Sequence, residues 1–233
     1  MTTASSGIQM RLVRWSEAHA MVLLAGTAMV LTGASVWILM MLACASFATL
    51  VWGCREAWPL PGRFGAANAL TTGRLLGVLA LPATGASNPL AVAACALMLF
   101  ALDGLDGWLA RRLGLVSEFG EYLDKEADAF FVLVLCVLLY TGGRLGIWII
   151  IPGLLRYGFV LFLMLAKPPA LKERRSARGR WMSIGMISAL IVAFTPFPVL
   201  YQPYALLMTL VLLYSFADTL FDVYRGPDAK RGT

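Results

Sequence analysis

Three long stretches of this chain carry no charged side chain, and they constrain its fold more than any other feature. No Asp, Glu, Lys or Arg occurs in residues 18–54, 75–102 or 181–217. A helical membrane crossing needs about 20 mostly apolar residues, so each stretch has room for two short crossings if a turn interrupts it. The whole chain is 60% hydrophobic and 14% charged, whereas soluble proteins are about 25% charged. This composition excludes a soluble enzyme, a disordered tail and a disulfide-stapled secreted domain.

The fold class that remains is an all-α polytopic membrane protein, because the apolar runs lack the alternation of barrel strands. Turn signals divide the long stretches into helices. Prolines and small polar residues interrupt the second stretch at 82–89 and the third at 195–203, whereas the first has only the weaker signal Gly33-Ala34-Ser35. After residue 65 we expect six core helices, at roughly 66–83, 89–112, 118–141, 146–166, 181–196 and 203–224.

The positions of the basic residues predict the orientation of these helices. One set of alternate loops holds nearly all the lysines and arginines of the core, and the opposite set holds only Arg144. The positive-inside rule places the first set in the cytoplasm. Topology therefore accounts for most of the net charge of +6, and no nucleic-acid partner is expected.

The same rule applies to the N-terminal apolar stretch, which follows Arg11 and Arg14. A cytoplasmic N-terminus requires a hairpin that turns near residue 34, and this gives eight crossings in all. A single long tilted helix, giving seven crossings, is the alternative. The predicted organisation is a cytoplasmic segment 1–17, an extra transmembrane hairpin 18–54, a six-helix core 55–224 and a cytoplasmic tail 225–233.

Four aspartates lie close together in the sequence, beside two expected helix ends: Asp103, Asp106, Asp124 and Asp128. Residues at i, i+3, i+4 and i+7 share a helix face, so the first two lie on one face together with the small residues Gly107 and Ala110. The other two recur four residues apart, in line with Gly120. The connection between the two helices is short, so we expect antiparallel neighbours whose four carboxylates meet near the cytoplasmic boundary.

Such a cluster needs positive charge, because carboxylates in a region of low dielectric repel one another. Two divalent cations meet this need, and oxygen ligands favour Mg²⁺ or Mn²⁺. Two ions about 3.5–4 Å apart can act on both the attacking and the leaving oxygen of a displacement at phosphorus. Gly107 and Ala110 leave space for a ligand, and Arg111 is placed to meet a phosphate. A two-histidine zinc site is excluded, since His19 is the only histidine.

The glutamates of the same region are interpreted differently from the aspartates. Asp103 and Asp106 directly follow an apolar run, and an ionisable residue inside a crossing is by default a functional hypothesis. The glutamates are expected to be solvated and paired with Arg111, Arg112 and Lys125; they are Glu118, Glu121 and Glu126.

The chain resembles a known family at these residues. The family is that of the CDP-alcohol phosphotransferases (CDP-alcohol phosphatidyltransferases). The chain matches every fixed position of the family's signature with the string Asp103-x-x-Asp106-Gly107-x-x-Ala110-Arg111, eight residues, Gly120-x-x-x-Asp124-x-x-x-Asp128. A second stretch, Asn68-x-Leu70-Thr71-x-x-Arg74, is similar to the opening of the family's first core helix, although Ala67 stands where a proline is frequent. The resemblance covers about residues 60–224, and the N-terminal hairpin lies outside it.

The resemblance implies a transferase that cleaves a CDP-linked donor, releases CMP and joins the remaining phosphoryl group to an alcohol. It implies that Asp103, Asp106 and Asp124 bind metal and that Asp128, close to the metals, is the general base. The residues implied in donor binding are Gly107, Ala110, Arg111, Gly120, Asn68, Thr71 and Arg74. By the same analogy we expect a homodimer in a bacterial inner membrane, with the site facing the cytoplasm.

The compact size resembles family members that use CDP-diacylglycerol as donor and a small alcohol as acceptor. If the acceptor is phosphorylated, as glycerol 3-phosphate and inositol phosphate are, Arg156, Arg178 and Arg180 are the expected contacts. Arg156 could instead pair with one of the site carboxylates. One alternative function is transfer from CDP-choline or CDP-ethanolamine to a lipid acceptor. Another is a divalent-cation transporter, which predicts acids along a path across the bilayer rather than a cluster at one boundary.

Overall fold

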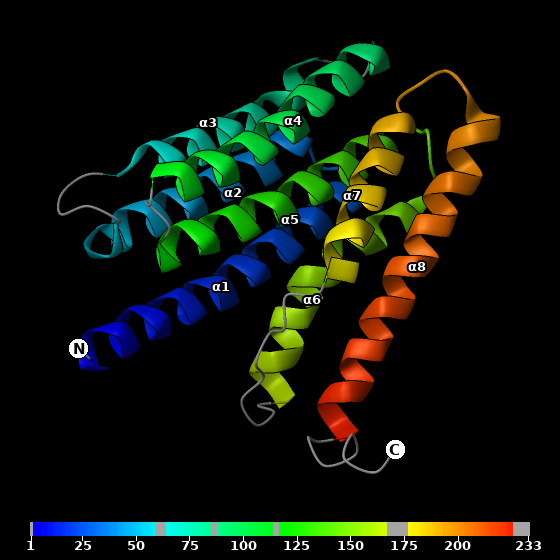
Figure 1. The fold of residues 1–233 in the computed structure, drawn as a ribbon. Coiled ribbons are helices and arrows are strands. Elements are labelled where there is room, and N and C mark those ends of the chain that lie inside the picture. Colours follow the sequence, from blue (N-terminus) through cyan, green and yellow to red (C-terminus); the bar gives the residue numbers. More distant parts are fainter. Residues whose placement is uncertain (1, 59–63, 85–87, 114–116, 167–176, 226–233) are drawn as a thin grey trace.

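The computed structural model describes the backbone of residues 2–58, 64–84, 88–113, 117–166 and 177–225. Side chains are described for the same residues except 2–6, 57, 105–113, 177–180 and 219–225. This part of the chain is all-helical, as predicted, with eight α-helices and three short 3-10 helices (Figure 1). The elements are α1 (Thr2–Leu31), α2 (Val36–Gly53), η1 (Arg55–Ala57), α3 (Ala66–Ala80), η2 (Leu81–Thr84), α4 (Pro89–Leu113), α5 (Glu118–Thr141), η3 (Ile147–Ile149), α6 (Ile150–Ala166), α7 (Ala177–Val192) and α8 (Pro198–Arg225).

The first two helices form the predicted hairpin, and its turn lies where the weak signal indicated. Gly33 has φ +100°, a left-handed conformation that favours glycine. Ser35 is the N-cap of α2, and its hydroxyl accepts a hydrogen bond from the Trp37 amide at 3.4 Å. The structure differs in one respect: α1 begins at Thr2, so segment 1–17 continues into the hairpin helix. No proline occurs in residues 2–31 to interrupt it.

Helix α5 lies at the centre of the bundle and carries much of its core. It packs against α3, α6 and α7, while α1 packs against both α2 and α6 (Figure 1). Its buried side chains are apolar on most sides and include Phe119, Leu123, Phe130 and Leu133. Its bounds are those predicted, because Ser117 caps the first turn by accepting a hydrogen bond from the Gly120 amide at 3.0 Å.

The last two helices are displaced from their expected bounds by several residues. Helix α7 covers Ala177–Val192 instead of 181–196, and α8 begins at Pro198 instead of residue 203. The expectation that Pro203 marks a turn is wrong, since it lies inside α8. Pro198 opens the helix, where a proline needs no hydrogen-bond partner. Pro203 removes one bond, to the carbonyl of Val199, and Val199 is 85% exposed.

Three described segments are long and apolar enough to cross a membrane: Val36–Gly53, Ile147–Ala166 and Pro198–Asp218. Two shorter apolar segments, Pro89–Gly104 and Trp181–Val192, lie in α4 and α7. These segments agree with a membrane protein. The count of eight crossings stays a prediction.

Candidate active site

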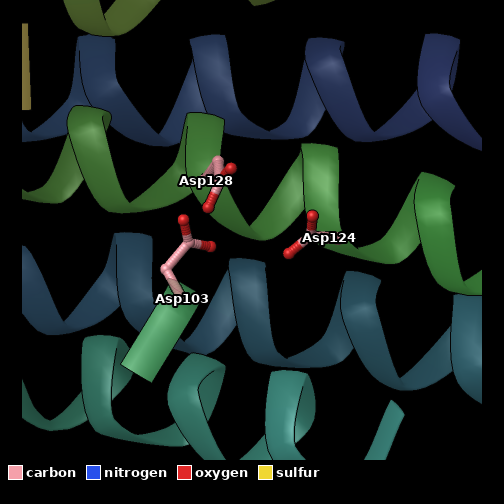
Figure 2. A group of neighbouring side chains, drawn as sticks. All are labelled: Asp103, Asp124 and Asp128. Carbon is pink, nitrogen blue, oxygen red and sulfur yellow. The ribbon is translucent and has the colours of Figure 1, made fainter. Parts of the chain in front are cut away.

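Three of the four predicted aspartates converge between α4 and α5. Figure 2 shows Asp103 of α4 pointing toward Asp124 and Asp128 of α5. One carboxylate oxygen from each lies within 4.8 Å of the others. Asp124 and Asp128 share a face because they are one helical turn apart. The expected meeting of carboxylates from the two helices is therefore confirmed for these three residues.

A buried arginine from a third helix lies among these carboxylates. The Arg74 side chain on α3 is only 3% exposed. Its Nη1 group contacts Asp103, and Nη2 donates to Asp128 at 2.6 Å and to Asp124 at 3.2 Å. The resemblance to the family implied that Arg74 binds the donor, but it did not predict that Arg74 contacts the aspartates. Among the described contacts, one guanidinium faces three carboxylates, an arrangement that can accommodate further positive charge.

Contacts between α3 and α5 bring Arg74 close to the aspartates. A Cβ added to Gly120 of α5 would lie 2.7 Å from Oδ1 of Asn68 on α3, so the Asn68 side chain keeps this position only beside a glycine. Asn68 is buried, and its Nδ2 donates to the Phe64 carbonyl at 2.8 Å. Thr71, also buried, donates to the Ala67 carbonyl at 3.1 Å. Asn68 and Gly120, both predicted to bind the donor, therefore meet where α3 contacts α5, and Thr71 lies one turn from Asn68 on the same face of α3.

The three carboxylates have the chemistry of a site for a hard divalent cation. Opposite ligands of an octahedral Mg²⁺ are about 4.2 Å apart, so oxygens within 4.8 Å need only small side-chain movements to share an ion. The carboxylates are 32–42% exposed, which leaves an open side for a substrate. The donor set therefore fits Mg²⁺ or Mn²⁺.

Several predicted site residues cannot be placed by their side chains. Asp106, Gly107, Ala110 and Arg111 lie on the backbone of α4, and Arg178 and Arg180 on that of α7, but their side chains lie outside the described part of the structure. Asp106 is three residues from Asp103 and so shares its helix face. Its place in the cluster stays a prediction.

Glu126 corrects the expectation that the glutamates of α5 are solvated. It is 1% exposed and pairs with Arg156 of α6. Arg156 donates to its two oxygens through Nη2 at 2.5 Å and Nε at 3.3 Å. Glu126 lies two residues from Asp124 and from Asp128, so it extends from the opposite face of α5. Among the described residues, Arg156 thus pairs with Glu126 and not with one of the site aspartates.

The N-terminal helix contributes to the same buried cluster, which sequence reasoning missed. Ser16 of α1 donates to Glu126 at 3.4 Å, and Tyr122 of α5 donates to the Leu12 carbonyl at 3.1 Å. His19 stacks on Trp15 with ring centroids 4.4 Å apart. The available signal was Arg156 itself, since a cation inside an apolar span needs a counter-charge. Glu126 lies two residues after Asp124 and two residues before Asp128, and this spacing places the counter-charge on the face of α5 opposite the aspartates.

Comparisons with known proteins agree with this geometry. A family model described as CDP-alcohol phosphatidyltransferase matches residues 64–218, which include Arg74 and all four aspartates. A CDP-diacylglycerol--glycerol-3-phosphate 3-phosphatidyltransferase of Bacillus subtilis (strain 168) is 29% identical over 107 residues. This match covers 44% of the chain and 55% of that protein, so the chain spans about half the length of this relative. No solved structure matches the chain.

Proposed function

Because the chain belongs to the CDP-alcohol phosphatidyltransferase family, we propose that it transfers the phosphatidyl group of CDP-diacylglycerol to a small alcohol and releases CMP. The convergence of Asp103, Asp124 and Asp128 inside the matched region is the observation that carries this proposal. The acceptor hydroxyl forms a new bond to the phosphatidyl phosphorus. The bond from that phosphorus to CMP breaks, and the hydroxyl proton goes to a carboxylate.

Each aspartate has a proposed role in this displacement. Asp103, Asp106, Asp124 and Asp128 hold the cations. Mg²⁺ or Mn²⁺, when bound, neutralises the pyrophosphate and stabilises the departing CMP. Asp128 takes the proton of the acceptor hydroxyl, a role that positioned carboxylates fill in general base catalysis. Its side chain is 42% exposed, so a hydroxyl can approach it.

The donor is proposed to lie along α3 and α4. Arg74 and Arg111 are the proposed contacts for the donor's phosphates, because both carry the positive charge that phosphates need and Arg74 lies among the aspartates of the site. Gly107 and Ala110 remove side-chain bulk on the face of α4 that carries the aspartates. Asn68, Thr71 and Gly120 border the same region through the α3–α5 contact.

The proposed acceptor is a phosphorylated alcohol of the glycerol 3-phosphate type. The similar Bacillus subtilis protein, which is named as a glycerol-3-phosphate phosphatidyltransferase, supports this choice. Arg178 and Arg180 at the start of α7 are the proposed contacts for the acceptor phosphate. Arg156, the third arginine of this prediction, is held by Glu126 on the far face of α5, and its role is tested separately below.

The apolar helices and the family support an integral membrane protein. The basic loops favour a site that faces the cytoplasm, since the aspartates lie at the end of α5 that follows Arg111 and Arg112. We propose the bacterial inner membrane as the location and a homodimer as the assembly, both by analogy with the family.

The decisive assay is CMP release from CDP-diacylglycerol by purified protein with Mg²⁺ or Mn²⁺. Glycerol 3-phosphate, inositol phosphate, inositol and serine are supplied in parallel as acceptors. Asp128→Asn is expected to lower the rate by about 10²- to 10⁴-fold. The matched control is Asp218→Asn, because Asp218 is exposed on α8. Absence of metal-dependent CMP release with every acceptor would contradict the proposal.

A further inference from the structure

The rear face of α5 carries a buried polar cluster that the proposed chemistry does not use. We call Ser16, Glu126 and Arg156 the rear cluster. It joins α1, α5 and α6, whereas the aspartate site joins α3, α4 and α5. Figure 1 shows α5 passing between these groups of helices. The two clusters therefore act on the same helix from opposite sides.

The geometry of the rear cluster is directional. The Arg156 guanidinium donates through two nitrogens to the two oxygens of Glu126, a fork that fixes both distance and orientation. Ser16 donates to the oxygen that already accepts the 2.5 Å bond. Apart from the Arg74 bonds at the aspartates and the Tyr122 bond to the Leu12 carbonyl, the remaining contacts around α5 are mostly apolar, and apolar burial has no preferred direction. Among the described contacts, the rear cluster is thus well suited to set the rotation and the axial position of α5.

Small movements of α5 have large effects at the aspartates. A carboxylate lies about 6 Å from its helix axis, so a rotation of about 20° moves it by about 2 Å. A slide by one residue moves it by about 1.5 Å. Metal–ligand distances tolerate only about 0.2 Å. The oxygens of Asp124 and Asp128 meet Asp103 within 4.8 Å only when α5 is held in place.

We propose that Glu126, Arg156 and Ser16 are positioning residues, which act through α5 to hold Asp124 and Asp128 in register with Asp103 for a divalent cation. This inference rests on the proposed function, in which the aspartates bind metal. It also gives the N-terminal hairpin a role, because Ser16 lies outside the matched region 64–218.

Arg156 is oriented in agreement with this role. On α6 the exposed residues Ile151 and Gly158 lie almost in line, because seven residues make nearly two turns. Arg156 is rotated from Ile151 by about 140° and so faces the bundle. Its partner Glu126 is 1% exposed and Arg156 itself is 28% exposed, so the ionic contact is largely buried on the side of Glu126.

The test measures Mn²⁺ binding to the full-length protein in detergent by electron paramagnetic resonance, together with thermal unfolding. Glu126→Gln and Arg156→Gln each leave one buried charge without its partner, so both thermal stability and Mn²⁺ affinity should fall. Replacing both residues with Met removes the charges together and should restore most of the stability. Mn²⁺ affinity should stay about tenfold weaker, since supporting residues behind metal ligands change affinity by about 10- to 100-fold. Ser16→Ala should weaken Mn²⁺ binding in the same direction by less.

A control and the contrary outcomes make the test decisive. Glu118→Gln changes an exposed acid on the same helix and should bind Mn²⁺ like the wild type. A double Met variant that regains both stability and wild-type Mn²⁺ affinity would show a merely structural pair and overturn the inference. The inference would also be overturned if the Arg156→Gln variant had a raised KM for the acceptor but bound Mn²⁺ normally, because Arg156 would then contact the acceptor. A wild type that binds no Mn²⁺ also overturns it. Mn²⁺ binding without CMP release would instead contradict the proposed function and leave the positioning role to be judged on the same titrations.

Discussion

Gly153 of α6 lies directly against the backbone of Leu133 on α5. A Cβ at position 153 would be 2.9 Å from the Leu133 Cα and 3.0 Å from its Cδ1. This approach is closer than side chains permit, so the two helices touch where glycine removes the side chain. The contact lies about two turns from Glu126 along α5 and less than one turn from Arg156 along α6, and it keeps those two residues within reach of each other.

Gly153→Ala is expected to force α5 and α6 apart, because the nearest atom belongs to the backbone and cannot rotate away. Overpacking of this kind costs about 1–3 kcal/mol. Thermal unfolding in detergent measures the loss. Gly158→Ala is the control on the same helix, since a Cβ there meets no atom within 4 Å. Equal melting temperatures for the two variants would show that the close approach is unimportant.

Gly120→Ala is expected to disturb the site rather than the bundle as a whole. The added Cβ would meet Asn68 Oδ1 at 2.7 Å, and the bond from Asn68 to the Phe64 carbonyl keeps that side chain in place. Either the Asn68 side chain gives up this bond and rotates away, or α3 shifts away from α5 and carries Arg74 with it. We expect CMP release to fall at least tenfold, or about 1.4 kcal/mol of barrier. Gly73→Ala, whose Cβ meets nothing within 4 Å, should keep wild-type activity, and a similar loss in both variants would contradict this account.

Arg74→Gln is expected to make folding stability depend on metal. Without a divalent cation the variant leaves Asp103, Asp124 and Asp128 without the guanidinium, and we expect a loss of about 1–3 kcal/mol. Added Mg²⁺ should restore much of this stability, because cations replace the missing positive charge. The measurement is the melting temperature in EDTA and in Mg²⁺, and the Mg²⁺-induced rise should be larger in the variant.

A surface arginine provides the comparison for Arg74. Arg11 pairs with Glu56 at 3.3 Å, but both side chains are mostly exposed. Such pairs contribute about 0–1 kcal/mol, so Arg11→Gln should change little in either buffer. If Arg74→Gln and the wild type respond equally to Mg²⁺, the guanidinium does not substitute for a cation.

The hairpin predicts opposite labelling of its two ends. After removal of the four native cysteines, Thr32→Cys in the exposed turn should react with a membrane-impermeant maleimide in intact cells. Gly7→Cys, exposed near the start of α1, should react only after permeabilisation, because Arg11 and Arg14 favour the cytoplasm. Labelling of position 7 in intact cells would contradict eight crossings.

The sequence predicted the parts of the fold that local signals control. Helix α5 has the bounds expected for it, because Ser117 caps one end and Gly142 with Gly143 ends the other. The three aspartates meet because helical spacing puts Asp124 and Asp128 on one face and because α3 packs against both α4 and α5. Pro203 was wrongly predicted to mark a turn, because it lies inside α8, where it removes only the hydrogen bond to the carbonyl of the exposed residue Val199.

Residues whose surroundings come from distant segments were harder to predict. Glu126 looks like its neighbours Glu118 and Glu121 in sequence, and only tertiary packing reveals that α1 and α6 enclose it. The contact between Arg74 and Asp128 joins residues 54 positions apart, which no local pattern encodes. The burial of a charge depends on which helices become neighbours, and periodicity does not determine that choice.

The order of Arg74 and the aspartates along the chain has a consequence for biogenesis. Arg74 is synthesised before Asp103, Asp124 and Asp128, each of which it contacts in the finished protein. A lone acid is costly to transfer into a bilayer, whereas one that meets a cation on arrival is less so. Each aspartate is thus synthesised after the arginine that it contacts, so its counter-charge on α3 is already present when α4 and α5 pack against that helix.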